Sequence, residues 1–149
     1  MELLTIQYQD IEKDVIERFL LGKIYHIARP EFFKIYDSQK TILKPSLRNK
    51  ESFYPQTKNS IGYKNDWISL FDMKKITDTI QYRQARSFHI IDEAYIFILK
   101  DIYKSFVIFQ RDLDMEKYIG YTFYPDFECW SQENIKYDSI DKIIHYKNV

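Results

Sequence analysis

Residues 124–130 read Tyr-Pro-Asp-Phe-Glu-Cys-Trp, a short aromatic stretch that carries a carboxylate where a strand would carry a hydrophobic side chain. Side chains along a strand alternate with a period of two, so Phe127 and Cys129 face one way while Glu128 and Trp130 face the other. Such a carboxylate is either solvated on an outward face or held in a cleft, where desolvation and hydrogen bonds make it useful. Glu128 is therefore the first candidate for a functional residue.

Length and composition indicate a single globular domain over residues 1–149. A chain of this size can remove about 70% of its unfolded surface from water, which is enough for one core. The aromatic share is high at 17%, with 13 Tyr and 11 Phe, so tyrosine is available both to a core and to a site. With only 3 Gly, the chain has no P-loop or Rossmann fingerprint.

Charge and cysteine content limit the classes of partner. Lys plus Arg equal Asp plus Glu at 22 each, so no global field attracts a polyanion, and nucleic acid is not expected as a bulk partner. The lone Cys129 suits a reducing compartment. No apolar run reaches the roughly 18 residues of a membrane span, and the N-terminal residues do not resemble a secretion signal. We therefore expect a cytoplasmic protein without a membrane partner or a structural zinc.

Hydrophobic periodicity predicts the secondary structure of the first half. Helices are expected over 10–21, 30–36 and 72–86, and strands over 23–29, 41–43 and 67–71. In the first of these strands, His26 shares a face with Ile24 and Ala28. The polar stretch between 44 and 66 contains two prolines and Gly62 and is expected to be a long loop, the best candidate for a lid.

The last third of the chain is rich in predicted strands. They are expected over 94–99, 105–111, 118–124, 127–130 and 142–146, with a turn at 112–117. The sequence thus predicts an α+β fold with a mostly antiparallel sheet, two packed sheets around a cleft, and helices concentrated in the N-terminal half.

Three regions, in the same order along the chain, resemble ADP-ribosyltransferase-fold proteins of bacterial and phage type, including toxin and defence members. The first is Lys-Ile-Tyr-His-Ile-Ala-Arg at 23–29, followed by a short helix and Ile-Leu-Lys-Pro at 42–45. The second is Trp-Ile-Ser-Leu-Phe-Asp at 67–72, before the predicted helix that bears Tyr82. The third is Phe-Glu-Cys-Trp at 127–130, trailing into residues 134–146. The Ser-Thr-Ser signature of many members is absent.

This resemblance implies NAD as substrate and cleavage of its nicotinamide–ribose bond. Glu128 would be the catalytic residue, since a carboxylate beside an oxocarbenium-like centre stabilises the transition state more than the ground state. His26 would contact the ribose hydroxyls, and Arg29 would pair with the pyrophosphate through its guanidinium fork. Tyr82 would stack on the nicotinamide, and Trp130 would wall the site against water. NAD and a protein acceptor are the partners that the resemblance implies.

Each of these residues also has a purely structural interpretation. His26 can be a packed core histidine, Arg29 a surface residue at a strand end, and Tyr82 a helix-to-sheet contact. Glu128 can be a charge that guards an edge strand against aggregation. If Asp126 acts instead of Glu128, the target preference would differ. For the enzymatic interpretation, we expect His26 and Glu128 to line one concavity.

Two other classes of function remain open. One is a non-enzymatic interaction protein, such as an inhibitor or antitoxin, that binds a partner through exposed tyrosines and the long loop. The other is a metal-independent nuclease or phosphodiesterase that uses His26 as base, Arg29 on phosphate and Glu128. The even charge balance counts against the second.

Overall fold

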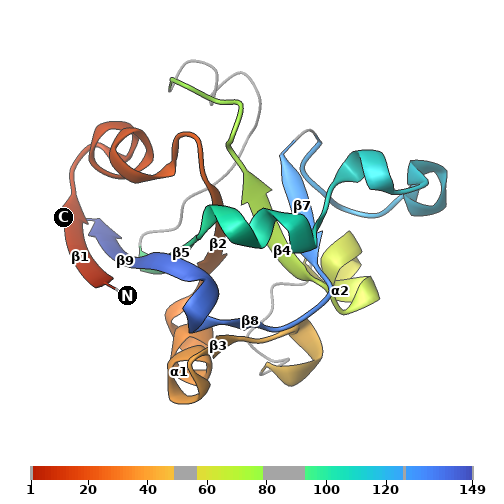
Figure 1. The fold of residues 1–149 in the computed structure, drawn as a ribbon, viewed down its shortest axis with the longest axis horizontal. Helices are drawn as coiled ribbons and strands as arrows, with labels where there is room; N and C mark the ends of the chain where they lie inside the picture. The colour runs from red at the N-terminus through yellow and green to blue at the C-terminus, as the bar shows by residue number, and fades with distance from the viewer. Residues whose placement is uncertain (1, 49–56, 79–92, 126, 149) are drawn as a thin grey trace.

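The computed structural model describes residues 2–48, 57–78, 93–125 and 127–148, and its centre is a seven-stranded sheet (Figure 1). The strand order is β1-β9-β5-β2-β4-β7-β6, and every neighbouring pair is antiparallel except β1 with β9. A second, two-stranded sheet pairs β3 with β8. The strands are β1 (Glu2–Tyr8), β2 (Ile24–Ala28), β3 (Thr41–Ile42), β4 (Ile68–Asp72), β5 (Glu93–Leu99), β6 (Val107–Ile108), β7 (Glu128–Ser131), β8 (Ile135–Lys136) and β9 (Ile140–Asn148). The fold is α+β with a mostly antiparallel open sheet.

Few helices accompany these strands in the described residues. The longer ones are η1 (Glu12–Leu20), which has π geometry, and α1 (Pro30–Gln39), and α2 (Ile61–Asn65) is a short third helix. Short segments of 3-10 helix are η2 (Pro45–Leu47), η4 (Thr57–Asn59), η5 (Asp101–Phe106), η6 (Gln110–Asp112), η7 (Met115–Tyr118) and η8 (Tyr137–Ser139). No helix in this part of the chain is long and apolar enough to cross a membrane.

The two predicted helices near the N-terminus are confirmed, with local reasons for their ends. Asp10 precedes η1, and its carboxylate accepts the backbone N–H groups of Glu12 and Lys13 at 3.1 and 3.3 Å, which satisfies two donors at the start of the helix. Pro30 begins α1, where its fixed φ suits the first turn. Helix α1 extends past the predicted end and stops at Lys40, whose φ of +50° breaks the helical path.

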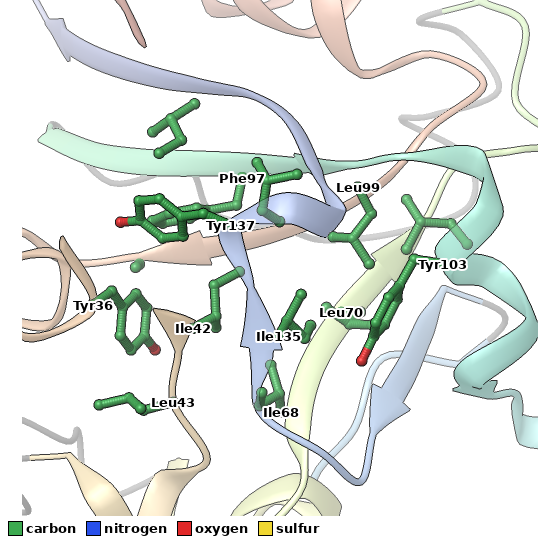
Figure 2. Close-up of a cluster of buried hydrophobic side chains, with 14 of the residues drawn as sticks. Tyr36, Ile42, Leu43, Ile68, Leu70, Phe97, Leu99, Tyr103, Ile135 and Tyr137 are labelled. Carbon is green, nitrogen blue, oxygen red and sulfur yellow. The ribbon is translucent and has the colours of Figure 1, made fainter. Parts of the chain in front are cut away.

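Hydrophobic residues fill both faces of the large sheet, because successive residues of its strands alternate between two clusters. On β4, Leu70 belongs to one cluster and Phe71 to the other. The first cluster, shown in Figure 2, brings α1, β3 and β8 against the sheet through Tyr36, Ile42 and Ile135. The second packs η1 against the opposite face. The sheet is therefore the middle layer of the fold.

Several predicted elements are wrong. The predicted strand over 118–124 is absent, because Asp114 caps η7 and Gly120 takes a φ of +89°, so the chain turns there. Only Thr122 makes a bridge, to Ser60. The strand predicted over 105–111 shortens to β6, which is flanked by η5 and η6.

Two other segments of the first half also depart from the predictions. Residues 73–78 do not start the predicted helix, since Met73 is bound through both backbone groups to the turn before β2, with Lys23 and Gly22 as partners. The rest of that helix, with Tyr82, lies outside the described residues. The polar stretch predicted to be one loop contains η2, η4 and α2, and residues 49–56 are not described.

Candidate functional site

Glu128 is the first residue of β7, an inner strand that lies between β4 and β6. Its side chain is buried, with 5% of its surface exposed. Glu128 is therefore neither a solvated carboxylate nor a charge that guards a sheet edge.

Three hydrogen-bond donors hold the Glu128 carboxylate. The Ser69 hydroxyl donates to Oε2 at 2.6 Å, the Trp130 indole N–H donates to the same oxygen at 3.2 Å, and the Tyr124 backbone N–H donates to Oε1 at 3.1 Å. Desolvation nevertheless raises the pKa of Glu128 above its ordinary value, outweighing the three donors. Since a carboxylate offers about four acceptor positions, these three donors do not saturate it.

No cation compensates this carboxylate within the described part of the chain. None of the ion pairs there includes Glu128, and no positive charge contributes to its pKa. The surroundings are aromatic instead: Trp130 is fully buried and packs on Trp67 with ring centroids 6.3 Å apart, and Tyr124 packs edge-on against Phe71. A buried carboxylate that is bonded only to neutral groups is unusual and marks a candidate site.

His26 is buried on β2, with 3% of its surface exposed. Its Nδ1 lies 2.7 Å from the Ser69 carbonyl oxygen and its Nε2 lies 3.2 Å from the Tyr36 hydroxyl. A carbonyl only accepts, so Nδ1 carries the proton and donates, and Nε2 accepts from Tyr36 when the ring is neutral. Burial, assisted by the charge of Arg48, lowers the pKa of His26 to about 3. Both ring nitrogens are thus engaged, as the core-histidine interpretation expects.

The register of the sheet places His26 and Glu128 on opposite faces. Tyr25 pairs with Phe71 and Phe71 pairs with Glu128, so these three side chains share a face, while His26 follows Tyr25 and points to the other. The prediction that His26 and Glu128 line one concavity is wrong for this reason. They are nevertheless close, because Ser69 binds His26 through its carbonyl and Glu128 through its hydroxyl.

The ladder between β2 and β4 is short, and His26 lies at its end. Only two pairs form, Ile24 with Asp72 and Tyr25 with Phe71, although β2 runs on to Ala28. Just past the last pair, the His26 imidazole binds the Ser69 carbonyl of β4 in place of a ladder hydrogen bond. At this point β2 and β4 are therefore joined by the His26 side chain, and the Ser69 that it binds also contacts Glu128.

The other predicted site residues have different surroundings. Arg29 lies between β2 and α1, is partly exposed, and pairs with Glu31 at 3.6 Å. Trp130 lies on the same face as Glu128, as predicted, and contacts it directly. Tyr82 and Asp126 lie outside the described residues, so their roles stay predictions.

Sequence reasoning missed two residues that contact this site. Ser69 is the one hydroxyl side chain in Trp-Ile-Ser-Leu-Phe-Asp. It lies two residues before Phe71, the partner of Glu128, and so shares a face with Glu128. A polar residue on one face of an apolar strand was the sequence feature that could have identified it. Gln110 binds the turn before Glu128, and no sequence pattern connects these two residues.

The described residues hold no group of three His, Cys, Asp or Glu side chains that would suit a metal ion. Comparison of the chain with protein-family models, with curated proteins and with solved structures finds no match. The argument for function therefore depends on the geometry of the Glu128 site and on the resemblance of the three sequence regions.

Proposed function

We propose that the chain cleaves the nicotinamide–ribose bond of NAD, as an ADP-ribosyltransferase or an NAD glycohydrolase, with Glu128 as the catalytic carboxylate. The observation that carries this proposal is that Glu128 is buried among neutral donors and aromatic rings, without a cation in the described chain. An oxocarbenium-like sugar would supply the positive charge that this environment lacks. Because that charge is largest on the sugar in the transition state, the carboxylate favours bond cleavage.

The contacts of Glu128 suit this role. Ser69 and Trp130 fix Oε2, and the remaining acceptor position of the carboxylate can take a ribose hydroxyl. The fully buried Trp130 keeps water away from the carboxylate, which strengthens its interaction with a cation.

Of the other predicted roles, that of His26 is dropped, because its side chain points to the face of the sheet opposite Glu128 and both of its ring nitrogens are engaged. Arg29 would hold the pyrophosphate, and Tyr82 would stack on the nicotinamide. NAD would reach Glu128 on the face of the large sheet that carries the second cluster, and the acceptor would be a protein, another molecule or water.

The test is nicotinamide release from NAD at millimolar concentration, followed by chromatography. Glu128→Gln keeps the shape of the side chain and removes its charge, so we expect kcat to fall by about 100-fold or more. Glu133→Gln is the matched control, because Glu133 is an exposed acid two residues after the end of β7, and the substitution keeps its backbone bonds to Ser131. Release that is equal in the wild type and in Glu128→Gln would exclude Glu128 as the catalytic group.

A non-enzymatic interaction protein is the second candidate, favoured by the segment between β6 and β7. None of the residues 109–125 is buried, and Ile119 is 81% exposed. In Figure 1 this segment stands out beside the sheet at the right. Ile119 lies in the chain between Tyr118 and Tyr121, whose rings pack edge to face with centroids 5.5 Å apart, and tyrosine is enriched at protein interfaces. Absence of NAD binding and of nicotinamide release in the folded protein would favour this function over the first.

A further inference from the structure

We infer that Gln110 is a positioning residue for Glu128, an inference that rests on the proposed function. Gln110 is the first residue of η6 and lies 18 positions before the carboxylate. Its side-chain Nε2 donates to two backbone carbonyls, those of Tyr124 and Glu128, each at 2.9 Å. One amide nitrogen thus joins the two ends of the turn that leads into β7.

The turn itself connects the backbone of Glu128 to its own carboxylate. The Glu128 N–H donates to the Tyr124 carbonyl at 3.0 Å, and the Tyr124 N–H donates to Glu128 Oε1 at 3.1 Å. Tyr124 therefore contacts both the main chain and the side chain of Glu128. A shift between the two ends of the turn would move Oε1, and the Gln110 amide opposes that shift.

The backbone of Gln110 is itself held in place by the hydrogen bonds of η6. In η6 the Phe109 N–H donates to the Asp112 carboxylate at 2.9 Å, and the Asp112 N–H donates to the Phe109 carbonyl at the same distance. The Leu113 N–H closes the turn onto the Gln110 carbonyl at 3.1 Å. These bonds fix the backbone from which the amide reaches the Glu128 turn.

The position of Gln110 requires an uncharged side chain that can donate two hydrogen bonds. A primary amide has two N–H groups on one nitrogen, which matches two carbonyl acceptors. Methionine has a similar length but no hydrogen-bond donor. Glutamate would place a carboxylate, which only accepts, against the carbonyls of Tyr124 and Glu128. A displacement of a catalytic group by about 1 Å can cost 100-fold in rate, so loss of this contact should be visible in kcat.

The experiment compares Gln110→Met and Gln110→Glu with Asn59→Ala. Asn59 is the matched control, because its side-chain amide also donates to a backbone carbonyl of the segment before β7, that of Gly120 at 2.9 Å, but away from the Glu128 turn. Two readouts are needed: the kinetics of nicotinamide release, and the NMR signal of the Trp130 indole N–H, assigned with Trp67→Phe. That N–H donates to Glu128 Oε2 and so reports where the carboxylate lies.

We expect both Gln110 variants to lower kcat by at least about 10-fold with little change in KM and to move the Trp130 indole signal, while Asn59→Ala changes neither. If Gln110→Met does not fold, Gln110→Asn, which keeps the amide on a shorter stem, takes its place. A folded variant with the wild-type kcat and the wild-type indole signal overturns the inference.

The two proposals fail in different ways. If the wild-type protein releases no nicotinamide, the proposed function fails, and the indole signal alone then decides the role of Gln110. In that case an unmoved signal in Gln110→Met overturns the positioning role, and a moved signal supports it. If release occurs and depends on Glu128 but not on Gln110, only the positioning role is lost.

Discussion

Ser69 donates its hydroxyl to the Glu128 carboxylate at 2.6 Å, across the pair of strands β4 and β7. The same residue accepts the imidazole N–H of His26 at its carbonyl oxygen. Ser69 therefore links polar side chains that point to opposite faces of a sheet whose faces are otherwise covered by hydrophobic clusters. Its two contacts can be separated by mutation, because one uses the side chain and the other the backbone.

Ser69→Ala removes the hydroxyl and leaves the carbonyl bond to His26. We expect the free energy of unfolding to fall by about 1–3 kcal/mol, because a buried carboxylate loses a donor. The measurement is urea denaturation at neutral pH. Ser38→Ala is the control, since the Ser38 hydroxyl is exposed and bonds only within α1. A loss no larger than that of the control would mean that the Ser69 hydroxyl contributes nothing to stability.

The stability contributed by Glu128 should depend on pH with a definite sign. Burial raises the pKa of this carboxyl above 4.5, so the folded protein holds the proton more tightly than the unfolded chain. The contribution is complete below pH 4.5 and is lost as pH rises through the folded pKa. Measured against Glu128→Gln, the wild type should therefore gain relative stability on acidification from pH 7 to pH 4. A difference that stays constant over this range contradicts the raised pKa.

His26 should have the opposite effect. Its pKa is lowered from 6.5 to about 3 by burial and by the charge of Arg48, so the unfolded chain binds the proton more readily. Stability is then lost as pH falls from 6.5 toward 3. His26→Gln keeps a donor for the Ser69 carbonyl but cannot be protonated. We expect the wild type to lose several kcal/mol relative to this variant over that range, measured by denaturation at a series of pH values.

That comparison needs a histidine in a different setting as its control. His145 pairs with Glu93 at 2.7 Å and stacks on Tyr95, so its partner is a carboxylate rather than a carbonyl. On acidification His26→Gln should become more stable relative to the wild type, and His145→Gln should not. Parallel behaviour of the two histidine variants would show that the effect does not come from His26.

Gly62→Ala should disturb the Trp130 indole. An added Cβ at this position would lie 3.0 Å from the Trp67 carbonyl oxygen and 3.3 Å from Trp130 Cδ1, tighter than most real contacts. We expect a loss of about 1–3 kcal/mol in thermal or urea unfolding. Lys64→Ala, on the exposed side of α2, is the control and should change stability by no more than about 0.5 kcal/mol. An equal effect of the two substitutions would contradict close packing at Gly62.

The local sequence pattern was sufficient to predict the strands and helices that contain many regularly spaced hydrophobic residues. Alternating hydrophobic residues predicted β2, β5 and β9, and apolar residues at helical spacing predicted η1 and α1. It failed for β1, whose residues are mostly exposed at the sheet edge and which pairs with the distant β9. It also failed over 118–124, where Gly120 and the cap at Asp114 outweigh aromatic strand propensity.

By itself, the sequence determined that Glu128 and Trp130 share a face and that His26 shares a face with Ile24 and Ala28, because a strand imposes a period of two on its own residues. Only the tertiary structure decided that His26 and Glu128 point to opposite faces, that Ser69 joins them and that Gln110 braces the turn before Glu128. Those relations depend on which strands pair and in which register, and pairing is set by packing between residues far apart in the chain.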